Sequence, residues 1–172
     1  MRFKPAAGHS TRVAKYALVL ARQMDMPAQM QKSIYLAGLV HDIGKIGISS
    51  ACLLKQGPLT ADEWEEIKRH PRLSYESLSA IPGMKEIALI ALCHHERYDG
   101  GGYPEGLSGE AIPLGARMIA VADSFDAMTS DRVYRPKMSC REAESELRRC
   151  AGTQFDPQVV KTFCSLMMNK EV

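Results

Sequence analysis

Apolar residues recur every three or four positions through most of the chain. Over residues 10–24 this spacing places Val13, Ala17 and Ala21 on one face of a helix. The same period predicts a second helix after Pro27, which runs through Ile34 to Val40 and stops near Gly44 and Gly47. It also predicts helices over 84–93, 116–128 and 157–167. No segment alternates with the period of two that marks a half-buried strand. The pattern therefore predicts an all-α fold.

Two further segments carry the residues that begin a helix. In Thr60-Ala-Asp-Glu63 and Ser139-Cys-Arg-Glu142, a hydroxyl three positions before a glutamate forms a capping box. The first predicts a short helix that ends before Pro71, because the residue preceding a proline resists the helical region. The second predicts a helix that ends near Gly152. These segments bring the expected total to about seven helices.

A glycine- and proline-rich loop from Arg97 to about Pro113 interrupts this helical pattern. Loops of this length are uncommon in compact helical domains and often serve a functional site. The 172 residues suit one compact domain over 1–172, and no linker or repeat divides them. We therefore expect a single domain with the loop at its site.

Composition excludes several classes of protein. The 22 basic and 20 acidic residues are too balanced to indicate a nucleic-acid polymer as partner. No apolar stretch approaches the roughly 20 residues that cross a bilayer, and no signal-peptide core follows the first residues. The 5 cysteines are scattered, which favours a reducing compartment. We expect a cytoplasmic protein that does not bind membranes.

All 5 histidines fall at or near expected helix ends. His9 begins the first helix, and His41 lies where the second ends. His70 closes the capped helix before proline, and His94 and His95 end another. A lone histidine is more often a hydrogen-bonded core residue than a metal ligand, but helix ends can converge on one pocket.

Two aspartates extend this set. Asp42 follows a histidine directly, and Asp123 lies on an apolar helix stripe, where a buried carboxylate needs a cation. Imidazole with carboxylate suits iron, manganese, zinc or nickel. Five imidazoles and two carboxylates exceed the needs of one tetrahedral ion, and suit two ions that share a carboxylate. Such pairs of ions are the usual equipment for phosphoester hydrolysis.

Two motifs point to a family. His41-Asp-Ile-Gly-Lys45 and His94-His-Glu-Arg-Tyr-Asp-Gly-Gly-Gly-Tyr-Pro104 resemble the HD-GYP domain, a branch of the HD superfamily of metal-dependent phosphohydrolases. The likeness also takes in segments 8–13, 68–71, 117–132 and 152–157. A bare His-Asp pair is uninformative, whereas the second motif is highly specific. The resemblance implies a helical phosphodiesterase that linearises the bacterial second messenger cyclic di-GMP to pGpG, often followed by cleavage to GMP.

The resemblance also implies the metal ligands by position. They are His9, His41, Asp42, His70, His94, His95 and Asp123, holding two divalent ions, with Asp42 as the bridge. Iron or manganese is the expected metal, with nickel and zinc as alternatives. The implied mechanism is in-line attack on the phosphate by a hydroxide that would bridge the ions, with the 3′ oxygen leaving. The implied catalytic residues are Asp42 and Lys45, whose ammonium stabilises charge on the phosphate.

Substrate contacts are expected from a second set of side chains: Lys45, Asp126, Arg132, Arg135, Gly102, Tyr103 and Pro104. Asp126 shares a helix face with Asp123 and is expected to contact Lys45 or the substrate. The planar fork of arginine suits phosphate and guanine edges. The glycines of the loop permit close backbone approach and positive φ.

Glu96 and Asp99 are expected to support the ligands from outside, Glu96 by orienting a histidine. For Glu96, an exposed helix-end charge is the alternative. Family members with a third metal carry a glutamate one helical turn before the first histidine, where this chain has Pro5. Proline offers no ligand atom, so we expect two ions, which leaves the second hydrolytic step in doubt.

The expected partners are cyclic di-GMP and, by the resemblance, a diguanylate cyclase domain or a regulatory receiver or sensor module. Such a module usually precedes the domain, so the chain is either a catalytic fragment or a stand-alone domain. Two other functions stay open. One is an inactive cyclic di-GMP receptor or docking module, which the presence of His41, Asp42 and Lys45 disfavours. The other is a general HD nucleotide phosphohydrolase, which needs neither His70 nor the Gly-Tyr-Pro loop.

Overall fold

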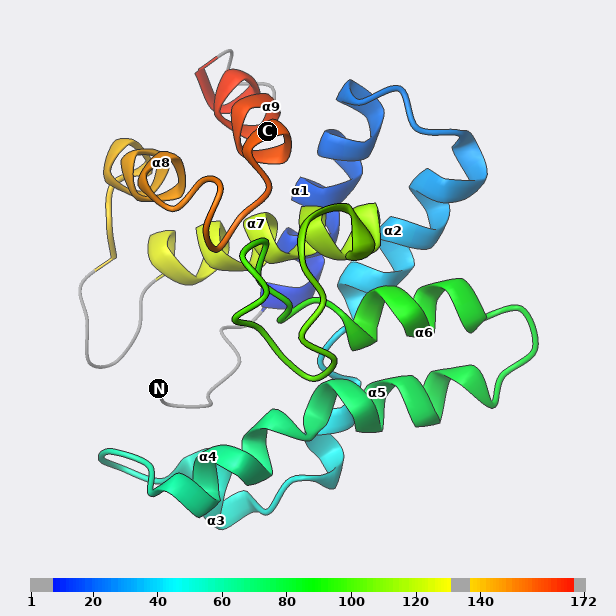
Figure 1. Ribbon diagram of the computed structural model, residues 1–172, viewed down its shortest axis with the longest axis vertical. Helices are drawn as coiled ribbons and strands as arrows, with labels where there is room; N and C mark the ends of the chain where they lie inside the picture. The colour runs from blue at the N-terminus through cyan, green and yellow to red at the C-terminus, as the bar shows by residue number, and fades with distance from the viewer. Residues whose placement is uncertain (1–7, 131–136, 169–172) are drawn as a thin grey trace.

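The computed structural model describes residues 8–130 and 137–168, and every regular element in them is helical (Figure 1). In chain order these elements are α1 (His9–Gln23), α2 (Ala28–Val40), the 3-10 helix η1 (Ile43–Gly47), α3 (Ser50–Leu54), α4 (Ala61–Lys68), α5 (His70–Ser79), α6 (Lys85–Leu92), the 3-10 helix η2 (Gly109–Ala111), α7 (Leu114–Thr129), α8 (Cys140–Arg149) and α9 (Pro157–Met168). The all-α prediction is confirmed.

The predicted number of helices is too low, because α3 and α5 were missed. Helix α3 has only 5 residues. It is capped by the Ser49 side chain, which accepts a hydrogen bond from the Cys52 amide. Helix α5 begins at His70 and holds Pro71 in its first turn, where the missing N–H costs nothing. The proline therefore begins a helix as well as ending one. As a result, His70 opens α5 and does not close α4.

The core lies where α1, α2, α6 and α7 pack together, with α8 and α9 against α7 (Figure 1). Helices α5 and α6 lie side by side, and α3 and α4 lie at the end of the molecule away from α9. Gly38 sets the spacing of α1 and α2, because a Cβ there would lie 2.7 Å from Cα of Ala14. This close approach brings the start of α1 beside the end of α2.

A second close approach joins η1 to α5. A Cβ at Gly44 would lie 2.1 Å from the His70 carbonyl oxygen, and the Gly44 amide donates to Ser74 Oγ at 2.8 Å. Ser74 Oγ in turn donates to the His41 carbonyl at 2.9 Å. Glycine is therefore needed for the turn after His41 to lie against the first turn of α5.

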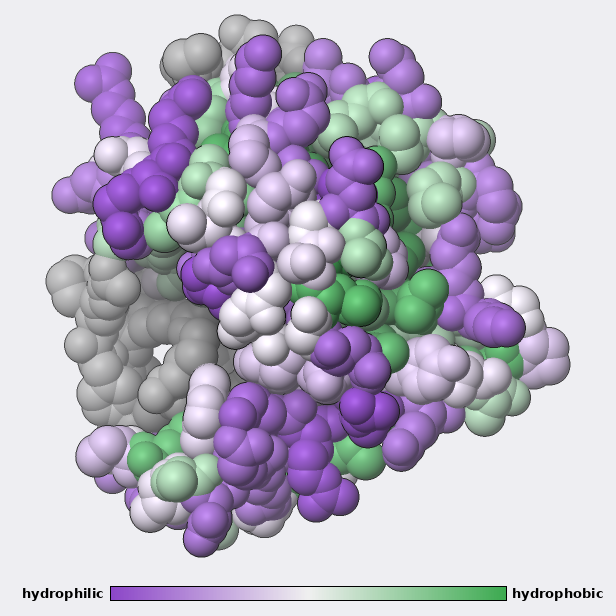
Figure 2. Space-filling view, viewed as in Figure 1, coloured by the Kyte–Doolittle hydropathy of each residue, from purple (hydrophilic) through white to green (hydrophobic). Residues whose placement is uncertain are grey.

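The surface in Figure 2 is mostly polar, with apolar side chains in small patches. Within 8–130 and 137–168, none of the helices combines the length and the apolar character needed to span a bilayer.

Candidate metal centre

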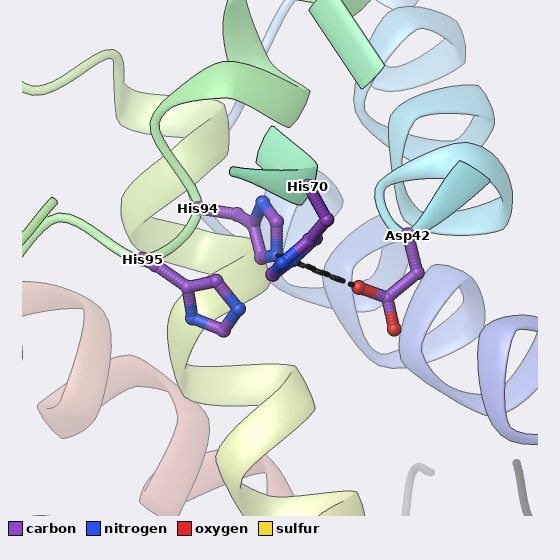
Figure 3. Close-up of side chains that lie close together, drawn as sticks. All are labelled: Asp42, His70, His94 and His95. Atoms are coloured by element: carbon purple, nitrogen blue, oxygen red, sulfur yellow. Dashed lines mark hydrogen bonds and ion pairs between the residues drawn. The ribbon is translucent and has the colours of Figure 1, made fainter. Parts of the chain in front are cut away.

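The structure brings six of the seven expected ligands together in two groups that share Asp42. In each group the potential ligand atoms lie within 4.8 Å of one another. One group holds Asp42, His70, His94 and His95, and the other holds His9, His41 and Asp42. Figure 3 shows the first group, with the three imidazoles gathered beside the Asp42 carboxylate. The side chains come from helix ends that are far apart in the sequence.

The seventh expected ligand, Asp123, lies beside the second group. Asp123 is on α7, and its Oδ1 lies 3.1 Å from Nε2 of His9. Burial alone would raise the pKa of Asp123, but the hydrogen bond from His9 and the proximity of His41 lower it. The carboxylate is therefore ionised at neutral pH and adjoins the same cluster.

Three of the histidines are oriented by backbone carbonyls three residues earlier. Nδ1 of His41 lies 2.8 Å from the Gly38 oxygen, and Nδ1 of His94 lies 2.6 Å from the Ala91 oxygen. Nδ1 of His70 makes the same contact with the Ile67 oxygen, at 2.7 Å. Carbonyls in the last turn of a helix lack partners within the helix, so a histidine there can donate to them. Each Nδ1 then carries the proton, and each Nε2 presents a lone pair to the centre.

Within the part of the chain that the structure describes, two buried polar atoms at the centre have no hydrogen-bond partner: Nε2 of His41 and Oδ1 of Asp42. The nearest imidazole nitrogen to that oxygen, His70 Nε2, lies 3.3 Å away without hydrogen-bonding geometry. An unsatisfied buried group costs about 1–3 kcal/mol, and a bound cation offsets this cost. The mixed nitrogen and oxygen donors suit a divalent transition metal. The residues therefore fit a pair of divalent ions with Asp42 between them.

The electrostatic environment of the centre favours the protonation states in which side chains can bind a metal. Burial, and then the proximity of His41, lower the pKa of His94 to about 3. Burial, and then His94, lower the pKa of His95 well below its usual value. Burial alone would raise the pKa of Asp42, but its neighbours, His41 first and Lys45 among them, hold it well below its usual range. At neutral pH, His94 and His95 are thus neutral imidazoles and Asp42 is an ionised carboxylate.

Lys45 lies at the same centre. Its Nζ is 2.5 Å from Oδ2 of Asp42, and its side chain is 14% exposed. The 3-10 helix η1 causes this contact, because its tighter turn brings residues three apart onto one edge. The structure therefore places an ammonium group beside the shared carboxylate.

Asp126 has partners that the sequence analysis did not name. Its Oδ2 lies 2.7 Å from Nδ1 of His9, and its Oδ1 accepts from Nε of Arg12 at 2.5 Å. Arg12 follows His9 by three residues and so lies on the same helix face. This spacing could have identified Arg12 as a neighbour of His9 from the sequence. The hydrogen bonds from His9 to Asp123 and Asp126 raise the pKa of His9 to about 9. Asp126, expected to meet Lys45 or the substrate, holds His9 in place.

Glu96 and Asp99, both expected to support the ligands, make their hydrogen bonds to residues of the loop. Glu96 is buried, and its carboxylate accepts from the amides of Glu105, at 2.6 Å, and Leu107, at 3.1 Å. Asp99 accepts from the Arg97 guanidinium and, at 3.0 Å, from the Gly101 amide. Neither carboxylate orients a histidine. Both carboxylates fix the conformation of the loop, because hydrogen bonds to an ionised carboxylate are stronger than those between neutral groups.

The Gly-Tyr-Pro segment lies against the centre. A Cβ at Gly102 would lie 2.3 Å from the Arg97 nitrogen, so only glycine fits this backbone contact. The Tyr103 ring stacks on His95, with ring centroids 5.0 Å apart and planes at 29°. Tyr103 and Pro104 also line a groove of about 410 Å³ between the loop and helices α4 and α5. The expected contacts Arg132 and Arg135 lie outside the described residues, as does Pro5.

The chain is similar to known proteins of one family over most of its length. The family model described as the HD domain matches residues 1–159. The chain is 47% identical over 151 residues to the cyclic di-GMP phosphodiesterase response regulator RpfG of Xanthomonas campestris, covering 87% of this chain and 40% of RpfG. It is 42% identical over 166 residues to a cyclic di-GMP phosphodiesterase of Thermotoga maritima, covering 95% and 45%. The chain thus spans less than half the length of these curated relatives.

Solved structures share the fold. A cyclic GMP-AMP-specific phosphodiesterase of Vibrio cholerae, V-cGAP3, superposes with a TM-score of 0.77 at 19% identity, covering 95% of this chain and 44% of that one. Bd1817, an HDG"Y"P protein from Bdellovibrio bacteriovorus, gives 0.72 at 17% identity, covering 93% and 51%. The fold, the two motifs and the family match agree: the chain belongs to the HD domain family, and its resemblance to the HD-GYP branch is confirmed.

Proposed function

We propose that this chain is a metal-dependent phosphodiesterase that hydrolyses cyclic di-GMP to pGpG at a binuclear centre. The observation that carries the proposal is Asp42, one carboxylate shared by two groups of potential ligands. Relatives named as cyclic di-GMP phosphodiesterases, at 47% and 42% identity, support the substrate class. A receptor that does not hydrolyse its ligand would not require buried histidine and aspartate atoms grouped for metal binding.

The proposed centre divides its ligands between two ions. His70, His94 and His95 would hold one ion with Asp42, while His9, His41 and Asp123 would hold the other with it. Bound divalent ions supply a Lewis acid for the phosphate oxygens and a nucleophile from water at neutral pH. The preferred metals are iron or manganese, and nickel or zinc suit the same donors. Pro5 has no ligand atom, and this supports two ions as opposed to three.

The protein's own charged groups act on the substrate at this centre. Lys45, 2.5 Å from the shared carboxylate, is placed to neutralise charge that develops on the phosphate in the transition state. The Tyr103 ring, stacked on His95, forms a wall of the centre on the side of the loop. Gly102, Pro104, Arg132 and Arg135 remain proposed substrate contacts, as does Asp126, although it also holds His9.

The proposed activity also has a proposed compartment and a proposed regulatory partner. All five cysteines are free, and this supports the reducing cytoplasm as its compartment. A diguanylate cyclase domain, or a receiver or sensor module, is the proposed partner that regulates it.

A product assay tests the proposed reaction. The protein is loaded with Mn²⁺ or Fe²⁺ without oxygen, incubated with cyclic di-GMP, and its products are separated by anion-exchange chromatography. We expect metal-dependent formation of pGpG, lost in Asp42→Ala and kept in Asp62→Ala, which removes an exposed aspartate of α4. Removal of the metal with a chelator abolishes turnover, and Mn²⁺ restores it.

Other outcomes of the same assay would contradict the proposal. Binding of cyclic di-GMP without turnover means a receptor. Turnover of simple nucleotides, but not of cyclic dinucleotides, means a general phosphohydrolase. The assay includes 3′3′-cGAMP, because relatives at 39% and 44% identity are named as specific for it. Faster cleavage of 3′3′-cGAMP would overturn the choice of substrate but not the binuclear centre.

A further inference from the structure

His95 differs from the other histidines of its group. His70 and His94 each donate from Nδ1 to a backbone carbonyl. Neither ring nitrogen of His95 has a hydrogen-bond partner within 8–130 and 137–168, and its ring is steadied by stacking on Tyr103. Metal-bound histidines nearly always donate their second ring N–H to an oxygen, which fixes the tautomer and the ring plane.

A small cavity of about 50 Å³ adjoins His95. Its lining includes His95, Asp123 and the polar side chains of Ser124 and Gln154. Within the described residues, neither the Ser124 hydroxyl nor the Gln154 amide makes a hydrogen bond. The cavity exceeds the 10–15 Å³ or so that one water needs, and it offers the polar partners that hold a water.

Gln154 is presented to this cavity by a firmly held turn. Its backbone N–H donates to the Cys150 carbonyl at 3.0 Å, and its own carbonyl accepts from Tyr98, three residues beyond His95, at 3.2 Å. The next residue, Phe155, is buried in the core. Asp156 then pairs with Arg117 at 2.5 Å. The turn is therefore fastened on both sides, so the position of Gln154 relative to His95 is set by the fold.

We propose that Gln154 is a positioning residue for His95. Its amide oxygen holds, through one water in the cavity, the N–H of the His95 ring nitrogen that faces away from Asp42. Water-mediated contacts of this kind are nearly as favourable as direct hydrogen bonds. The inference rests on the binuclear centre proposed above and adds a function for segment 152–157. It predicts that Gln154 acts on the ion held by His70, His94 and His95, and not on the other ion.

Metal binding, measured without any nucleotide, tests this role. Mn²⁺ is titrated into the metal-free protein, and the two binding steps are followed by electron paramagnetic resonance, which also reports coupling between two ions. In Gln154→Leu we expect one step to weaken about 10- to 100-fold and the coupled signal to fall, because outer-shell partners contribute this much to affinity. Gln154→Glu keeps an acceptor oxygen and should bind within about threefold of the unaltered protein.

Two controls separate positioning from stability. Gln158→Leu makes the same change at an exposed glutamine of α9 and should leave both binding steps unchanged. Thermal unfolding of the metal-free proteins should give the same midpoint for Gln154→Leu and the unaltered chain. If leucine is not tolerated, Gln154→Met replaces it, since methionine has similar length and no amide.

The outcomes that contradict the inference are distinct from those that contradict the proposed function. If the unaltered protein binds two Mn²⁺ ions and Gln154→Leu binds them equally well, this inference alone is wrong. If Gln154→Leu weakens both steps equally, or if Gln154→Leu and Gln154→Met both lower the unfolding midpoint, the residue is structural and the inference is also wrong. If the unaltered protein binds one ion, the binuclear centre fails, and the inference fails with it.

Discussion

On one side of Asp42, His70 and His94 are buried and donate to backbone carbonyls at helix ends, 2.7 and 2.6 Å away. On the other side, His9 contacts the carboxylates of Asp123 and Asp126, at 3.1 and 2.7 Å. A carbonyl is a neutral acceptor, whereas a carboxylate carries a charge that favours the protonated ring. His9 is therefore held by a different physical means from His70 and His94.

This difference changes what each side must do to bind a metal. The pKa of His94 is lowered to about 3, chiefly by burial, so its ring is neutral at pH 7. The pKa of His9 is raised to about 9, chiefly by its hydrogen bond to Asp123, so in the metal-free protein its ring is charged. A metal ligand must be deprotonated. The His94 side is thus ready for an ion, while the His9 side must first release a proton.

The largest effect is expected at the residue that both sides share. Asp42→Ala should abolish both metal-binding steps and lower turnover at least about 10³-fold. When catalytic residues act as a unit, removal of one of them abolishes most of the rate enhancement that they provide jointly. His70→Ala should lose one ion only. Metal content per chain, measured by mass spectrometry after gel filtration, checks both. One remaining ion in Asp42→Ala would show that the two groups do not share this ligand.

A smaller effect is expected where only the His9 side is altered. Asp126→Asn removes the charge that holds the His9 ring and should weaken one ion about 10- to 100-fold, with the other ion unchanged. Asp99→Asn is the matched control, since that aspartate is exposed and contacts Arg97. Calorimetric titration with Mn²⁺ resolves the two steps. Equal weakening of both would mean that the sides are not independent.

The two sides should also differ in their dependence on pH. The pKa of His9 is raised from 6.5 to about 9, so its stabilising contribution in the metal-free protein is full below 6.5 and is lost as pH rises through 9. Over that interval the affinity of the His9 side for Mn²⁺ should rise by up to about tenfold per pH unit, one proton being released.

The affinity of the His94 side should stay nearly constant over the same interval, because His94 is already neutral. Titrations at several pH values, repeated in two buffers of different ionisation enthalpy, count the protons released. Equal proton release from the two sides, or none from either, would contradict the comparison.

The smallest effect is expected from the loop that covers the His95 side. Glu96→Gln leaves one acceptor oxygen for two loop amides, so the free energy of unfolding should fall by about 1–3 kcal/mol. Metal content should stay at two ions while turnover falls severalfold, because Tyr103 loses some of its support. Glu110→Gln, an exposed change in the same loop, is the control. Loss of a metal ion in Glu96→Gln would mean that Glu96 acts on the ligands after all.

Several features of the site were predictable because they depend on residues near one another in the chain. Histidines at helix ends follow from helix periodicity and punctuation, and Gly102 follows from a turn that needs close approach. The second role of Pro71 was not evident, since a proline can both end one helix and begin the next. The role of Glu96 was missed because the path of a long loop depends on what it packs against.

The sequence by itself determined the helical fold, the types of ligand atom and the family, since periodicity and motifs are properties of neighbouring residues. Only the tertiary structure decided which potential ligands lie around Asp42, which nitrogen of His41, His70 and His94 faces the centre, and that Asp126 holds His9. These features depend on atoms of α1, α2, α5, α6 and α7 that meet across the core. Their distances follow from packing, such as the contact of Gly38 with Ala14, and no local pattern contains them.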